Sequence, residues 1–261
     1  MNEVNKTLYI PLYGKAEVSK KNIIINDPYA EKIWESEKFK VTGKAKSKWL
    51  TYNMAMRARI FDDWVCKMIQ DNPNAVILHI GCGLDSRFLR VAEKYQTWVD
   101  ADFPEVIDIR KKYYSENNNY KMLPFNATET DKIQQFPDNE CAIIVLEGIS
   151  MYLKNSELNE VFIALEKKYR TVHVLMDVYT VFGAKASKYK NPINNVGVTT
   201  VWGIDRVEDV LKETSLKCKK EHSMTPEELV DELTGFERTF FKFMFTGALY
   251  SKIYRLYELE S

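Results

Sequence analysis

The stretch that most constrains the fold is residues 75–106, which combine a buried-type strand, a glycine turn and acidic residues in a fixed order. An apolar run at 75–80 leads into Gly81-Cys82-Gly83, and a helix-compatible segment then joins a second strand-like run. That run ends in three acidic positions, Asp100, Asp102 and Glu105. Glycine lets the backbone turn tightly beside a ligand, and a carboxylate at the end of the next strand can accept both ribose hydroxyls. The order predicts a βαβ unit that binds an adenosine-containing cofactor.

The glycine turn also indicates which cofactor fits. A dinucleotide site has a third glycine or an alanine where this chain has Ser86, at the point where a pyrophosphate meets the helix N-terminus. S-adenosyl-L-methionine has no phosphate but still needs the ribose carboxylate, and Asp102 lies 21 residues after Gly81. These residues favour a methyltransferase over an NAD-dependent oxidoreductase. A tight turn without any cofactor stays open as a third alternative.

Composition narrows the class of protein further. The 261 residues, 45% of them hydrophobic, suffice for one α/β domain around one core. Basic and acidic residues both number 37, so the net charge gives no sign of a nucleic-acid partner. Four scattered cysteines and three histidines form no zinc motif, so we expect no metal. Without a signal-peptide pattern or an 18-residue apolar run, we expect a cytoplasmic protein with no membrane partner. The sequence does not indicate an oligomeric state.

Strand-like and helix-like segments alternate along most of the chain. Residues 1–70 predict a helical cap, and strands are expected at 75–80, 96–101, 121–125, 141–146 and 171–178. This alternation predicts a Rossmann-like, doubly wound, mostly parallel sheet with helices on both faces, all in one domain over 1–261. A further strand is expected at 216–222 and a final edge strand at 254–258. Residues 180–205 predict a lid-like insertion over the site.

Four separate motifs resemble the leucine carboxyl methyltransferase family, including its tetracenomycin-type polyketide O-methyltransferases. They are GCGLDSR at 81–87 with DFP at 102–104, NDPYA at 26–30, MRARIFDD at 56–63 and LEGISMYL at 146–153. The similarity spans most of residues 7–180, with the motifs in family order. It implies a class I methyltransferase fold and S-adenosyl-L-methionine as cofactor.

The resemblance also implies site residues for the sugar and the amino-acid part of the cofactor. It selects Asp102 for the ribose, whereas the residues alone do not separate Asp102 from Asp100. It places Arg57 opposite the cofactor carboxylate, where a planar guanidinium fork suits a carboxylate, with Arg59 as the alternative. Lys15 resembles a second basic residue that faces the same carboxylate.

Other candidates lie at strand ends. Gly81 and Gly83 are expected against the methionine part of the cofactor. Glu147 follows a strand at the edge where such sheets bind ligands, and its carboxylate can accept from the cofactor ammonium group. Asn126 and Ala127 occupy the place where the family often has an acidic residue, and the amide would contact the adenine amino group without charge.

The expected reaction needs little acid–base machinery. A carboxylate acceptor is ionised at neutral pH and needs no general base, whereas a phenol would need one, with Tyr152 or His173 as candidates. His79 is expected to be a core histidine and Cys82 a small lining residue. The sequence therefore predicts a small-molecule O-methyltransferase acting on a carboxylate or hydroxyl, with an acceptor pocket built by residues 1–50 and 180–205. A protein C-terminal carboxylate, NAD-dependent oxidation and non-catalytic cofactor binding are the alternatives.

Overall fold

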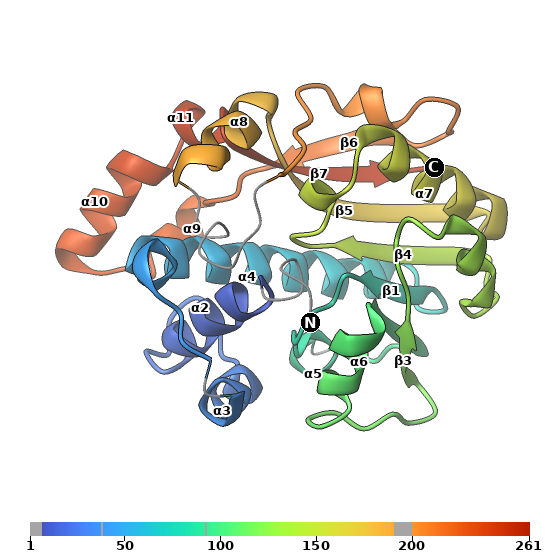
Figure 1. Ribbon diagram of the computed structural model, residues 1–261, viewed down its shortest axis with the longest axis horizontal. Helices are drawn as coiled ribbons and strands as arrows, with labels where there is room; N and C mark the ends of the chain where they lie inside the picture. Colours follow the sequence, from blue (N-terminus) through green and yellow to red (C-terminus); the bar gives the residue numbers. More distant parts are fainter. Residues whose placement is uncertain (1–6, 38, 92, 191–199) are drawn as a thin grey trace.

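The computed structural model of the chain describes residues 7–37, 39–91, 93–190 and 200–261. A seven-stranded sheet in the order β3-β2-β1-β4-β5-β7-β6 forms its centre (Figure 1). In chain order the strands are β1 (Val76–Ile80), β2 (Thr97–Asp102), β3 (Tyr120–Pro124), β4 (Cys141–Leu146), β5 (Thr171–Tyr179), β6 (Lys217–His222) and β7 (Tyr254–Glu260).

The first five strands run parallel to one another, as the alternating pattern predicts. All five residues of β1 are buried, because a parallel sheet covered by helices on both faces hides both sides of its central strands. The predicted Rossmann-like, doubly wound, mostly parallel sheet is confirmed. The strand order turns back between β1 and β4, which places a ligand crevice at the carboxyl ends of those two strands.

The last strand differs from the prediction. The strand expected at 254–258 is confirmed as β7, but its predicted edge position is wrong, because β7 lies inside the sheet, antiparallel to both β5 and β6. The edge is β6, whose lysines Lys217, Lys219 and Lys220 are exposed. Charged side chains on an edge strand discourage pairing with another chain. A short sequence pattern shows that a strand exists but not which neighbour will cover it.

Helices cover both faces of the sheet. They are α2 (Tyr9–Ser19), α3 (Pro28–Glu37), α4 (Lys48–Asp71), α5 (Arg87–Arg90), α6 (Pro104–Arg110), α7 (Asn155–Lys168), α8 (Val181–Lys190), α9 (Glu227–Val230), α10 (Gly235–Phe245) and α11 (Ala248–Ser251). Helices α2, α4 and α6 share a core with one face of the sheet, and α7 packs on the other.

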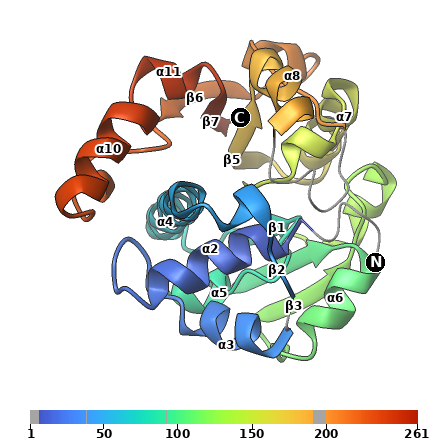
Figure 2. The same ribbon diagram turned by 60° about the vertical axis from the view of Figure 1, so that its left-hand side comes forward.

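The predicted helical cap at 1–70 corresponds to α2, α3 and α4 in its described part. Figure 2 shows these three helices together, with α10 and α11 on the other side of α4. Short 3₁₀ turns join the elements: η1 (Gly43–Lys46), η2 (Thr130–Gln135), η3 (Ser150–Tyr152) and η5 (Val207–Val210). Among the described residues, none of the helices has the length and apolar character needed to cross a membrane.

The expected lid at 180–205 falls partly outside the described residues, which omit 191–199. Its first part forms α8, and Gly203 follows the gap. The peptide N–H of Ile204 donates to the Tyr179 carbonyl at 2.8 Å, so residues 200–204 run beside the end of β5. A lid therefore stays a prediction.

Candidate cofactor site

A cavity of about 290 Å³ opens at the carboxyl ends of β1, β2 and β4, beneath α2. Its walls come from α2, α4, the glycine turn, the end of β2, the loop after β4 and the start of β7. Six of the predicted site residues line it: Lys15, Arg57, Gly81, Gly83, Asp102 and Glu147. The fold therefore brings together side chains that lie up to 132 positions apart in the sequence, from Lys15 to Glu147.

The glycine turn needs its glycines for two physical reasons. Gly81 and Gly83 have φ of +73° and +52°, a region that disfavours side chains. A Cβ on Gly81 would also stand 2.7 Å from Ile149 Cδ1. Arg110 of α6 holds the turn from below by donating to the carbonyls of Gly83 and Asp85, at 2.8 Å each. The loop is thus fixed before any ligand arrives.

The structure separates the two candidate ribose carboxylates. Asp100 is buried, forms an ion pair with Arg110 and accepts from the Tyr120 hydroxyl at 2.7 Å. Asp102 instead lines the cavity and accepts from the peptide N–H groups of Gly83 and Phe103, at 2.7 Å each. Burial raises the pKa of Asp102 to about 6, although both N–H groups act to lower it. Asp102 is therefore the carboxylate available to a ligand.

Arg57 and Glu147 meet at the floor of the cavity. Arg57 Nε donates to Glu147 Oε1 at 3.0 Å, and Arg57 Nη1 donates to Asp177 Oδ2 at 2.8 Å. Burial acts to raise the pKa of Glu147, but Arg87 and Arg57 together lower it to about 2. Arg59 lies on the exposed side of α4, paired with Asp63, so the position of Arg57 on the cavity wall favours Arg57 over Arg59.

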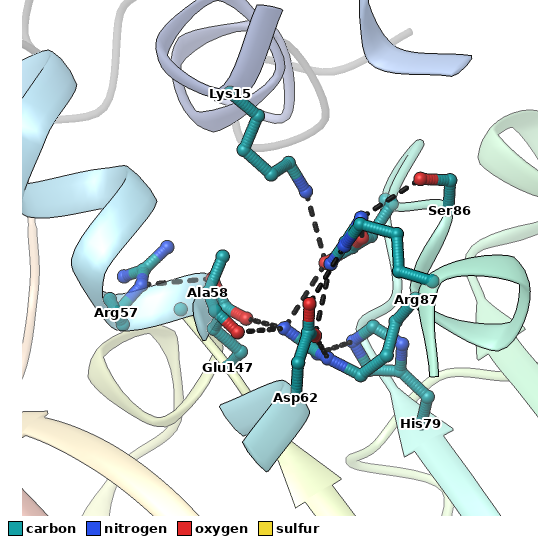
Figure 3. A network of polar contacts seen from close by, with 12 residues as sticks. Lys15, Arg57, Ala58, Asp62, His79, Ser86, Arg87 and Glu147 are labelled. Atoms are coloured by element: carbon teal, nitrogen blue, oxygen red, sulfur yellow. Dashed lines mark hydrogen bonds and ion pairs between the residues drawn. The ribbon is translucent and has the colours of Figure 1, made fainter. Parts of the chain in front are cut away.

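Lys15 reaches the same cavity from the cap. Its Nζ lies 3.0 Å from Asp85 Oδ2, and both side chains are almost fully buried. Asp85 occupies a position in the glycine turn and also pairs with Arg90 at 2.6 Å. Figure 3 shows Lys15 descending toward this cluster, with Arg87 between Asp62, Glu147 and His79. The cap and the glycine turn are thus joined by buried ion pairs.

The remaining candidates have different environments. Asn126 and Ala127 are not part of the cavity wall, and Asn126 Oδ1 instead accepts from the Thr128 N–H at 3.1 Å. Their adenine contact stays a prediction that the cavity does not support. His173 is also absent from the wall and lies 3.7 Å from Glu260. His79 and Cys82 are buried at the wall, and burial raises the pKa of the Cys82 thiol well above its usual value.

Sequence reasoning missed several residues that support this site. Asp177 and Tyr254 hold Arg57, and Asp62 pairs with both Arg87 and Arg90. The sequence contained one indication of Asp177, since it is the only acidic residue in the otherwise buried-type run 171–178. A carboxylate inside such a strand needs buried partners. The acceptor pocket expected from residues 1–50 and 180–205 stays a prediction; of the first segment, Leu8, Ile10 and Leu50 line the cavity. The described part of 180–205, however, contributes no wall residue, and Tyr250 and Ile253 stand there instead.

Comparisons with known proteins agree with this geometry. Over 152 residues the chain is 32% identical to the tetracenomycin polyketide synthesis O-methyltransferase TcmP of Streptomyces glaucescens, covering 58% of this chain and 56% of that protein. The match thus spans just over half the length of that relative. An S-adenosyl-L-methionine-dependent methyltransferase, dpfgK of Gibberella zeae, is 25% identical over 227 residues, covering 77% and 75%.

A solved structure and a family profile complete the comparison. The magnesium protoporphyrin IX methyltransferase ChlM of Synechocystis PCC 6803, with bound SAH, superposes with a TM-score of 0.54 at 10% identity, covering 89% of this chain and 94% of that one. That likeness confirms the expected class I methyltransferase fold. The leucine carboxyl methyltransferase profile matches residues 13–166, more than half of the chain. The protein therefore belongs to the leucine carboxyl methyltransferase family.

Proposed function

We propose that this protein is an S-adenosyl-L-methionine-dependent O-methyltransferase that acts on a carboxylate or hydroxyl of a small molecule. The observation that carries the proposal is the single cavity that holds Asp102, Arg57, Lys15 and Glu147 beside the glycine turn. A carboxylate for the ribose, cations for a carboxylate and an anion for an ammonium group match the three polar parts of this cofactor.

The roles that we propose for the wall residues require neither a metal nor a nucleophilic side chain. When bound, the cofactor supplies a methyl group on a positively charged sulfur. Asp102 would hold the ribose, and Glu147 would accept from the ammonium group. Apolar wall residues such as Leu8, Met54 and Ile253 would exclude water, so that rate enhancement comes from alignment in a dry pocket.

The cavity favours a carboxylate acceptor over a hydroxyl acceptor. A hydroxyl needs a base near its proton. Tyr152 lines the cavity, but burial raises its pKa to about 12, so it keeps its proton at neutral pH. His79 Nε2 faces Arg87 at 3.3 Å, and burial lowers the pKa of this histidine. His173 lies elsewhere. A carboxylate acceptor needs none of these groups, and the tetracenomycin relative supports a small molecule as its carrier.

Nicotinamide chemistry fits the site less well. Helix α5 is a single turn, and Ser86 before it donates to Asp27 at 2.6 Å instead of facing a ligand. Asp85, an anion, lines the cavity where a pyrophosphate would approach the turn. The negative charge of Asp85 would therefore repel the negatively charged pyrophosphate.

A thermal-shift titration tests the cofactor directly. S-adenosyl-L-methionine, S-adenosylhomocysteine, NAD and NADP are compared at one common concentration, and a ligand present at 100 times its dissociation constant stabilises by about 2.7 kcal/mol. For a domain of this size the melting temperature should rise by roughly 5–10 °C with the first two ligands. A rise with NAD alone would overturn the proposal. Methyl transfer from labelled cofactor to a panel of aromatic and aliphatic acids and phenols then separates carboxylate from hydroxyl acceptors.

A further inference from the structure

Asp177 occupies an unusual place on β5, fully buried behind the cavity wall and not part of its lining. Its Oδ1 accepts from the Gly148 N–H at 2.6 Å. Its Oδ2 accepts from Arg57 Nη1 at 2.8 Å and from the Tyr254 hydroxyl. One carboxylate thereby joins α4, the loop after β4 and the start of β7.

These contacts determine which part of Arg57 faces the ligand. Nε donates to Glu147, and Nη1 donates to both Asp177 and Tyr254, the latter at 3.0 Å. Within the described chain, Nη2 has no hydrogen-bond acceptor. It lies 3.2 Å from the point that a Cβ on Gly148 would occupy. Only one terminal nitrogen of the guanidinium is therefore left for a ligand, instead of the two-pronged fork that the sequence suggests.

We propose that Asp177 is a positioning residue for the amino-acid end of the cofactor: it locks Arg57 so that Nη2 points at the cofactor carboxylate. This inference rests on the proposed function. An arginine side chain has many rotamers, and holding it in place beforehand removes part of the entropy lost on binding. Gly148 contributes in two ways. Its N–H donates to the same Asp177 carboxylate, and its missing Cβ leaves room for Arg57 Nη2.

The test follows from which ligand atoms Arg57 would touch. Isothermal titration measures binding of S-adenosyl-L-methionine, S-adenosylhomocysteine and 5′-methylthioadenosine, an adenosine thioether without the amino-acid part. Asp177→Asn places an amide N–H₂ against the Arg57 and Tyr254 donors, or against the Gly148 N–H. We expect it to weaken the first two ligands about tenfold, as for loss of one hydrogen bond to a charged group. Binding of methylthioadenosine should not change.

Two further variants sharpen the comparison. Tyr254→Phe keeps the carboxylate but removes one of its partners, and it should weaken the same two ligands about threefold, because the Asp177–Arg57 contact remains. It also serves if Asp177→Asn does not fold. Asp63→Asn is the matched control, because Asp63 pairs with Arg59 on the exposed side of α4. It should leave the affinity for each ligand at the wild-type value.

Each contrary outcome has a separate meaning. Equal weakening of all three ligands would show a general structural role for Asp177 and overturn the inference. So would unchanged affinities in Asp177→Asn or, where only Tyr254→Phe folds, in that variant. Selective loss of S-adenosyl-L-methionine alone would indicate that its sulfonium charge is sensed, and would overturn positioning through the carboxylate. A wild-type protein that binds none of the three would instead contradict the proposed function.

Discussion

At the scale of single residues, the two acidic side chains at the end of β2 show how different partners give similar groups different roles. Asp100 is neutralised by Arg110, whereas Asp102 receives only peptide N–H groups and faces the cavity. Peptide N–H groups stabilise a carboxylate less completely than a guanidinium does. Asp102 can therefore accept further hydrogen bonds, which the two hydroxyls of a ribose would donate.

That difference predicts a pH dependence of cofactor binding. Burial raises the pKa of Asp102 to about 6, so the carboxylate that we propose for the ribose is protonated below that pH. Affinity for S-adenosylhomocysteine should be constant above pH 7 and about tenfold weaker at pH 5, since one ionisation controls it. Titration calorimetry between pH 5 and pH 8 measures this. Asp102→Asn should bind weakly and without that pH dependence.

The raised pKa of Asp102 affects the stability of the fold in the direction opposite to its effect on ligand affinity. Between its usual pKa and about 6, folded Asp102 holds a proton that the unfolded chain releases. Its contribution to the free energy of unfolding therefore rises as pH falls, while ligand affinity falls. A pH-independent affinity in the wild type would remove Asp102 from the ribose site.

How far single residues are predictable depends on whether their chemistry is local. Gly81, Gly83 and Asp102 sit in one βαβ unit, whose order of residues predicted the two glycines and an acidic strand end, while the family resemblance selected Asp102 over Asp100. Asp177 and Tyr254 act through Arg57, 120 and 197 positions away, and no local pattern joins them. Asn126 was placed by resemblance alone, and its side chain instead closes its own turn.

At the scale of elements, residues 200–204 are held against β5 by an unusually close backbone approach. A Cβ on Gly203 would meet the Thr180 carbonyl oxygen at 2.4 Å. That oxygen belongs to the backbone, so it cannot rotate away. The neighbouring peptide groups connect this segment to the site, because the Trp202 N–H donates to the Met151 carbonyl at 2.8 Å and Met151 lines the cavity.

We therefore expect Gly203→Ala to destabilise the protein. Overpacking of this kind costs about 1–3 kcal/mol, and for a domain of this size the melting temperature should fall by roughly 2–12 °C. Thermal denaturation followed by circular dichroism measures the change. Thr200→Ala, at an exposed position in the same segment, is the control and should stay within 1 °C of wild type in this assay. Equal melting temperatures for both variants would contradict the close approach.

Elements with strong periodicity were predictable, and those that depend on distant partners were not. The central strands β1 and β4 were found because buried strands read as apolar runs. The interior place of β7 was missed, since it is set by β6, a strand with five exposed positions out of six. The helix-compatible segment after the glycine turn forms only the single turn α5, where Arg87 and Arg90 point to buried carboxylates instead of solvent.

At the scale of the whole molecule, buried ion pairs connect the cap to the sheet. Asp62 of α4 accepts from Arg87 Nε at 2.6 Å and from Arg90 Nε at 2.8 Å, and Arg90 also pairs with Asp27. Such pairs contribute little net stability when complete, but breaking one leaves buried charges without partners. The cap and the sheet should therefore unfold as one unit.

Asp62→Ala tests this coupling. Removing the carboxylate leaves two buried guanidinium groups short of a partner, which costs about 3–5 kcal/mol, or a melting temperature lower by roughly 6–20 °C. Tryptophan fluorescence is weighted toward the cap, which holds Trp34, Trp49 and Trp64, whereas far-ultraviolet circular dichroism follows the whole fold. Both signals should shift together in wild type and variant. If fluorescence changed well before circular dichroism, the cap would be melting by itself, and the cofactor site beneath α2 would open without unfolding the sheet.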